Sequence, residues 1–128
     1  MERLQGPGPD SILGIDLGTT NTLLSWHDGE SARILAPSPD QALLPSVVAI
    51  LPDGTELIGD AAKALALRHP RRVIYSVKRL IGRSLSEIRV EAERLPYQVV
   101  EGAGGQVRIR IALDGAEGRP AFKDYSPE

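Results

Sequence analysis

The stretch Ile12-Leu13-Gly14-Ile15-Asp16-Leu17-Gly18-Thr19-Thr20-Asn21 holds the residues that decide the fold of this chain. An apolar run ends in a glycine and two threonines, and the segment from Thr22 to His27 again has strand character before Asp28-Gly29. Short apolar segments bounded by turn residues are typical of β-strands. We therefore predict a β-hairpin over 12–27 whose turn contains Gly-Thr-Thr-Asn.

The side chains of this turn also suit the binding of phosphate. Successive backbone N–H groups in a glycine-containing turn can converge on an anion, and threonine hydroxyls add further donors. Asp16 stands two residues before the turn, and one carboxylate beside a phosphate can orient a hydrated Mg²⁺ ion. The same residue types are common in ordinary hairpin turns. Taken alone, the residues therefore leave two interpretations open, a phosphate-binding turn and a plain hairpin.

Length and composition exclude several classes of protein. The chain has 128 residues, enough for one modest domain or a piece of a larger one. A formal charge of -2 argues against a general nucleic-acid or membrane-surface binder. The absence of cysteine excludes disulfides, thiolate metal sites and cysteine nucleophiles within these residues. The first ten residues lack the apolar region of a signal peptide. We expect a flexible tail over 1–11 and a cytoplasmic protein.

Further along the chain, strand and helix patterns alternate. Ala32 to Ala36 is predicted to be a third strand, and Pro37, Pro39 and Pro45 then interrupt regular structure. Further strands are predicted at 46–51, 55–59, 97–101 and 106–112, the first two joined by a Pro-Asp-Gly turn. Helices are predicted at 61–69 with Asp60 as cap, at 73–81 with Gly82 as stop, from Ser86 to about Arg94, and again from Ser126.

One stretch of the chain is basic, although the whole chain is not. From Ala61 to Ser86 there is no acidic residue, whereas Lys63, Arg68, Arg71, Arg72, Lys78, Arg79 and Arg83 are cationic. The residues alone allow either a polyanion-binding surface or an ordinary solvated face. His27 and His69 are interpreted as structural or surface residues, and Trp26 as a core or interface residue.

The stretch from Ile12 to Asn21 resembles the first phosphate motif of the heat shock protein 70 chaperones, of the DnaK and HscA type. Three further stretches match the family in order and spacing, and the resemblance runs from about Ile12 to Glu128. They are Leu44-Pro45-Ser46-Val47-Val48, Ile58-Gly59-Asp60-Ala61-Ala62-Lys63 and Val77-Lys78-Arg79-Leu80-Ile81-Gly82-Arg83.

The resemblance implies a fold as well as a family. It implies an α/β fold, α+β in the small subdomain, that is a partial, truncated actin-like (ribonuclease H-like) ATPase domain. Residues 12–45 would begin the ATPase subdomain with the first phosphate loop, and residues 46–123 would form the small subdomain of the same lobe. Residues 124–128 would begin a helix that the chain truncates. The second phosphate loop, the adenosine pocket and the peptide-binding domain of the family are expected downstream of residue 128.

Carried over residue by residue, the resemblance implies an ATP or ADP site with Mg²⁺. Gly18, Thr19, Thr20 and Asn21 would surround the β- and γ-phosphates, and Asp16 would help to place Mg²⁺ through water. Lys78 matches the family's catalytic lysine and is expected near the γ-phosphate, where it also contributes to binding the nucleotide. Arg79 matches a neighbouring basic residue of the family.

The parent protein is therefore expected to be an ATP-hydrolysing chaperone that controls peptide binding and protein folding, whereas the fragment alone is expected to be inactive. The resemblance implies client peptides, a J-domain co-chaperone and a nucleotide-exchange factor as partners, with no nucleic acid or membrane. One alternative is an HscA-type chaperone for iron-sulfur cluster assembly. Others are a sugar kinase or actin-like filament protein, and a non-enzymatic protein-interaction module with a vestigial phosphate turn.

The apolar residues of the hairpin lead to one further expectation. If the strands that normally cover them lie downstream, Ile12, Ile15 and Leu17 have no cover within this chain. Two isolated strands are marginal in water, and an open sheet edge pairs readily with another chain. We expect residues 12–36 either to self-associate or to exchange their amide hydrogens quickly.

Overall fold

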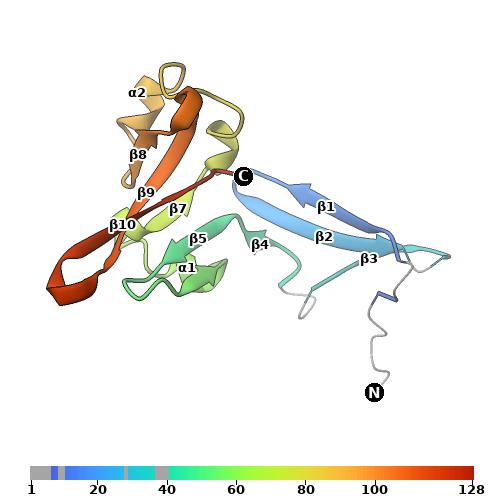
Figure 1. Ribbon diagram of the computed structural model, residues 1–128. Helices are drawn as coiled ribbons and strands as arrows, with labels where there is room; N and C mark the ends of the chain where they lie inside the picture. The colour runs from blue at the N-terminus through green and yellow to red at the C-terminus, as the bar shows by residue number, and fades with distance from the viewer. Residues whose placement is uncertain (1–6, 9–10, 28, 37–40) are drawn as a thin grey trace.

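The computed structural model describes residues 7–8, 11–27, 29–36 and 41–128, and within them the chain forms three antiparallel sheets (Figure 1). Most of the expected tail over 1–11, together with Asp28, Pro37 and Pro39, lies outside these residues. No helix in the described part of the chain is long and apolar enough to cross a membrane.

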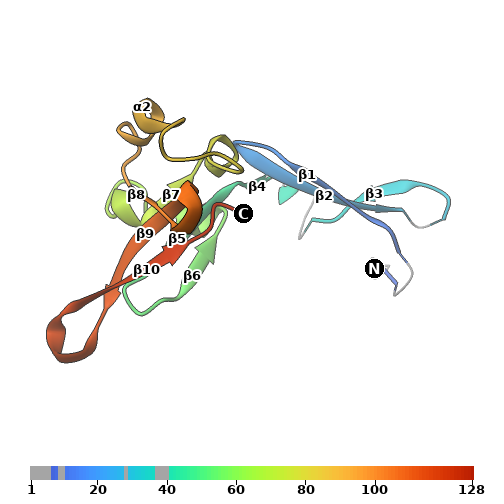
Figure 2. The same cartoon turned by 45° about the horizontal axis from the view of Figure 1, so that its top comes forward.

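The N-terminal sheet is built on the predicted hairpin. Strand β1 (Leu13–Leu17) pairs with β2 (Asn21–His27), which pairs in turn with β3 (Ala32–Ile34) and β4 (Leu44–Pro45). The hairpin and the third strand are thus confirmed. In both views the long β1–β2–β3 ribbon extends away from the other two sheets (Figures 1 and 2).

The apolar residues of this ribbon are exposed. Leu13 is 54% exposed, Ile15 67% and Leu17 43%, and these alternate residues share one face of strand β1. None of the residues described between 11 and 36 is part of a buried hydrophobic cluster. The sheet is therefore held by its own backbone hydrogen bonds and by its junction with β4, without a core of its own.

The other two sheets enclose the core. One has the order β6 (Glu56–Ile58), β5 (Val47–Ile50), β7 (Val73–Tyr75). The other has the order β10 (Pro120–Tyr125), β9 (Val107–Asp114), β8 (Gln98–Glu101). The predicted Pro-Asp-Gly turn joins β5 to β6, with Gly54 at φ 86°, a conformation that glycine adopts at little cost.

Strict alternation along β9 puts every second side chain into this core. Val107, Ile109 and Ile111 are each 1% exposed, while Arg108 and Arg110 point to the opposite face. Tyr97 is buried with them and donates its hydroxyl hydrogen bond to the Tyr75 carbonyl at 2.6 Å. This burial raises the pKa of Tyr97. The full buried cluster is Ile50, Ile74, Leu80, Ile88, Tyr97, Val107, Ile109 and Ile111.

Helices are shorter than the sequence pattern predicts. The helix predicted at 61–69 is reduced to α1 (Asp60–Lys63), where Asp60 is the first helical residue and Gly59, not Asp60, holds the cap position. The prediction of a helix at 73–81 is wrong. Its first part is strand β7, and only the short 3₁₀ turn η3 (Val77–Arg79) follows. The β-branched and aromatic residues Val73-Ile74-Tyr75 pair with β5, which overrides their helical spacing.

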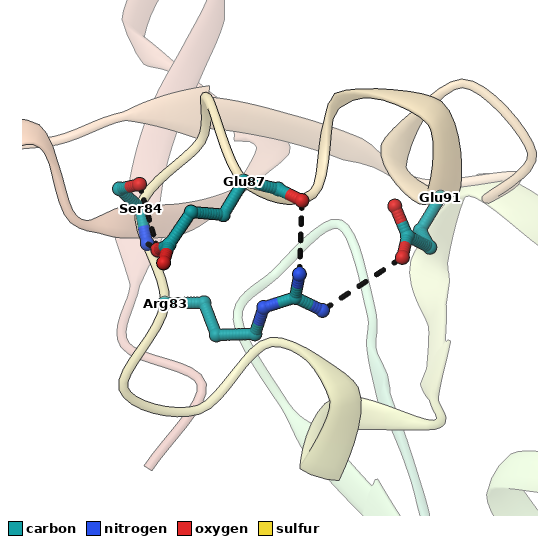
Figure 3. A network of polar contacts seen from close by, with 4 residues as sticks. All are labelled: Arg83, Ser84, Glu87 and Glu91. Carbon is teal, nitrogen blue, oxygen red and sulfur yellow. Dashed lines mark hydrogen bonds and ion pairs between the residues drawn. The ribbon is translucent and has the colours of Figure 1, made fainter.

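The helix predicted from Ser86 begins later, as α2 (Arg89–Ala92), after a turn closed by polar side chains (Figure 3). The Ser84 N–H and hydroxyl both donate to the Glu87 carboxylate, at 2.7 and 2.8 Å. Arg83 donates to the Glu87 carbonyl at 2.9 Å and lies 3.7 Å from the Glu91 carboxylate. The two hydrogen bonds from Ser84 lower the pKa of Glu87, and the contacts of Arg83 connect this turn to α2.

The prediction of a helix at 124–128 is also wrong. Asp124 and Tyr125 belong to β10, and no helix includes Ser126–Glu128. Arg110 on β9 binds both carboxylate oxygens of Asp124 at 2.7 Å, and Tyr125 packs against the core. These contacts continue the strand to residue 125, and the cap-like sequence Ser126-Pro127-Glu128 follows it without a turn of helix.

Candidate phosphate-binding site

The turn between β1 and β2 is tight enough to require glycine. The Gly18 N–H donates to the Asn21 carbonyl at 2.9 Å, which closes the turn around Thr19 and Thr20. A Cβ atom placed on Gly18 would lie 2.4 Å from that carbonyl oxygen, so any larger residue would force the turn open. The Gly18 N–H is used within the turn. The donors that remain for a phosphate are therefore those of the two threonines and Asn21.

Ser46 fixes this turn from a distant part of the chain. Its hydroxyl donates to the Gly18 carbonyl at 2.8 Å and lies 2.9 Å from the Thr22 hydroxyl. Its N–H donates to the Thr20 carbonyl at 2.8 Å. Sequence reasoning assigned no role to Ser46, although it stands inside one of the matching stretches, Leu44 to Val48. That shared position was the signal that could have identified it.

Gly59, in the matching stretch from Ile58 to Lys63, packs against the same region of the structure. Gly59 has φ 67°, and a Cβ atom there would lie 2.6 Å from the Leu44 side chain. Its N–H donates to the Val47 carbonyl at 2.9 Å. Leu44 pairs with Thr22 in the ladder between β4 and β2. Close packing at Gly59 therefore positions β4, and β4 holds the start of β2 just after the turn.

The side chains predicted to face phosphate are accessible. Thr20, Asn21 and Asp16 are exposed, and Thr19 is half-buried. Asp16 lies on β1 opposite Leu23 of β2, one residue before the end of the strand. In the described part of the chain no three His, Asp or Glu residues gather into a metal-binding group. Asp16 is therefore not part of such a group, and a single carboxylate can still orient an ion that keeps most of its water ligands.

Lys78 lies in η3, directly after β7. Val77 packs against the core and Leu80 is 1% exposed, so both neighbours anchor the segment while the Lys78 side chain is exposed. Ser76 begins the turn in a left-handed conformation, φ 57°. Lys78 forms no ion pair with any residue in the described part of the chain. Its ammonium group is therefore available to an anionic ligand.

The fold brings the two predicted parts of the site to one place. In both views the end of the hairpin formed by the β1–β2 turn lies beside the segment after β7 that contains η3 (Figures 1 and 2). These segments are separated by the whole region from β2 to β7 in sequence. A pair of threonines and an exposed lysine on adjoining segments can bind successive phosphate groups of one ligand, through hydroxyl donors and a compact positive charge.

Comparison with known proteins identifies the family. The family described as Hsp70 protein matches residues 12–127. The chain is 39% identical over 117 residues to the chaperone protein DnaK of Akkermansia muciniphila, covering 91% of this chain and 17% of that protein. It is 39% identical over 108 residues to the chaperone protein dnaK3 of Thermosynechococcus vestitus, covering 84% of this chain and 16% of that protein.

The chain therefore spans about a sixth of the length of these relatives. The sheet-rich mixture of strands and short helices is consistent with part of an actin-like ATPase domain and confirms the predicted fold class. Together, the fold and the match over residues 12–127 show that this chain belongs to the Hsp70 family.

Proposed function

We propose that this chain supplies one side of the nucleotide-binding site of an ATP-hydrolysing Hsp70 chaperone. The observation that carries the proposal is the position of the β1–β2 turn beside the segment that contains η3. In this proposal Thr19, Thr20 and Asn21 bind the β- and γ-phosphates, while Gly18 permits the tight turn. Lys78 lies at the γ-phosphate and stabilises the charge that develops during transfer.

The residues present fit ATP or ADP with Mg²⁺. The exposed turn offers hydroxyl and N–H donors without a competing carboxylate inside it, and Lys78 adds a positive charge. Asp16 would orient water molecules bound to Mg²⁺. The bound ion would neutralise phosphate charge, and the threonines would fix the orientation of the phosphates. A site built from one side only binds its ligand weakly, because oriented charge needs donors on both sides.

For the whole protein we propose a cytoplasmic chaperone that couples ATP hydrolysis to the binding of client peptides. Its partners would be a J-domain co-chaperone and a nucleotide-exchange factor. A DnaK-type protein is favoured because both relatives described above have that name. An HscA-type chaperone for iron-sulfur cluster assembly is the alternative within the family. The rival from another class is a protein-interaction module whose phosphate turn is vestigial.

This chain alone should bind nucleotide much more weakly than a complete site does. We expect the 128-residue chain to bind Mg-ATP with a dissociation constant of no better than about 100 μM, that is, about -5.5 kcal/mol. It should hydrolyse ATP no faster than a protein-free control. Isothermal titration calorimetry and a phosphate-release assay would measure both. A submicromolar affinity would contradict the one-sided site.

A further inference from the structure

The face of the β10-β9-β8 sheet that points away from the core is not part of the proposed nucleotide site. Ile109 and Tyr125 are paired across β9 and β10 and face the core. The next pair, Arg110 and Asp124, therefore lies on the opposite face, because side chains alternate along a strand. Phe122, two residues from Asp124, is on that same outer face and is 61% exposed.

A groove of about 470 Å³ runs over this outer face. Its lining comes from the 3₁₀ turn η2 (Pro70–Arg72), from the segment around Tyr97, and from β9 and β10. The residues that line it combine cationic and apolar side chains, and no carboxylate is among them. They include Arg71, Arg72, Arg110, Pro96, Ala112 and Phe122.

The three arginines of the groove differ in their hydrogen-bond partners and in their exposure. Arg110 is held by Asp124 through two hydrogen bonds of 2.7 Å, and this contact lowers the pKa of Asp124. Arg72 is half-buried and donates to the Ile50 carbonyl at 3.2 Å, which fixes its guanidinium but leaves other N–H groups unused. Arg71 is exposed, and its side chain forms no hydrogen bond or ion pair with the described residues. Of these three arginines, Arg110 alone is therefore paired with a carboxylate from the described residues.

We propose that this groove binds an acidic peptide segment that carries an apolar side chain beside its carboxylates. Arginine binds a carboxylate through two parallel N–H donors, and Arg71 and Arg72 both line the groove with such donors. Phe122, Ala112 and Pro96 provide the apolar wall that an aliphatic or aromatic side chain would cover. This mixture favours a peptide over nucleic acid, because the chain as a whole has a net charge of -2. The proposal is independent of the nucleotide site.

The test uses the full 128-residue chain and a short fluorescein-labelled peptide in which glutamates flank a central leucine. Fluorescence anisotropy gives its dissociation constant. We expect Arg71→Gln to weaken binding about tenfold, because it removes a charge-assisted contact. Phe122→Ser should weaken it about fivefold. Asp124→Asn should instead strengthen binding about threefold, since it releases Arg110 for the peptide.

Two matched control variants distinguish binding in the groove from non-specific attraction of the peptide to the protein surface. Arg68→Gln removes an equal charge from an exposed residue outside the groove, and Leu67→Ser removes an apolar side chain that is 97% exposed. Both should leave the affinity within about twofold. No measurable binding of the glutamate peptide, or equal binding of a peptide with glutamine at those positions, would overturn the proposal. So would equal losses for Arg68→Gln and Arg71→Gln, or displacement by tripolyphosphate with no effect of Phe122→Ser.

Discussion

Replacing Lys78 by alanine should lower the rate of ATP hydrolysis at least about 100-fold, with the affinity for ATP changed less than about tenfold. The protein for this experiment is a chimera in which residues 12–127 replace the corresponding segment of the Akkermansia muciniphila DnaK, to which they are similar. A charge that acts on the transferred group stabilises the transition state more than the bound ground state. Single-turnover hydrolysis and nucleotide titration would measure the two quantities.

Lys63→Ala is the matched control for this experiment. Lys63 is an exposed lysine in the last turn of α1, and its removal should leave hydrolysis within about twofold. If the chimera hydrolyses ATP and Lys78→Ala hydrolyses it at the same rate, Lys78 has no catalytic role. An inactive chimera that still binds ATP would favour the interaction module with a vestigial turn.

Ile109→Ala should destabilise the 128-residue chain by about 2–5 kcal/mol, whereas Ile15→Ala should cost less than about 1 kcal/mol. Ile109 is 1% exposed between two sheets, so its truncation leaves a cavity. Ile15 is 67% exposed on an edge strand, so its truncation removes little contact. Urea unfolding monitored by the single tryptophan and by circular dichroism would measure both changes.

Comparing the Ile109→Ala and Ile15→Ala variants shows which part of the chain contributes most to its stability. A loss at Ile15 as large as the loss at Ile109 would mean that the apolar face of β1 is covered in solution. Analytical ultracentrifugation of the unmodified chain would then show whether a second copy provides the cover, as expected for an open strand edge. Without such cover, the amides of residues 12–36 should exchange faster than those of β9.

Local sequence patterns predicted the strands better than the helices. The β1–β2 hairpin and the alternation along β9 were predictable because turn residues and period-two burial are local features. The apolar spacing from Val73 to Ile81 fits a helix, and here this local pattern predicts the wrong structure. Strand β7 depends on pairing with β5, more than twenty residues earlier in the chain, which local spacing does not record.

The candidate site was only partly predictable for a similar reason. The residue types of Asp16 and Thr19 fit a phosphate-binding turn and a plain hairpin equally, and Lys78 alone fits a solvated face, so the resemblance decides between these interpretations. The contacts of Ser46 with Gly18 and Thr22 span 28 and 24 residues, so no local pattern contains them. Strand β10 was missed, and with it the groove beside Phe122, because Gly115, Gly118 and Pro120 interrupt the apolar pattern around its hairpin.

The most direct test of the central claim is a double-mutant cycle between Thr19→Val and Lys78→Ala, measured by single-turnover ATP hydrolysis in the chimera. If both residues act on the same phosphate groups, the double variant should be at least about tenfold faster than the product of the two single losses predicts, a coupling of about 1.4 kcal/mol or more. Losses that simply multiply would mean that the two segments act independently, and would contradict a shared phosphate site at the β1–β2 turn.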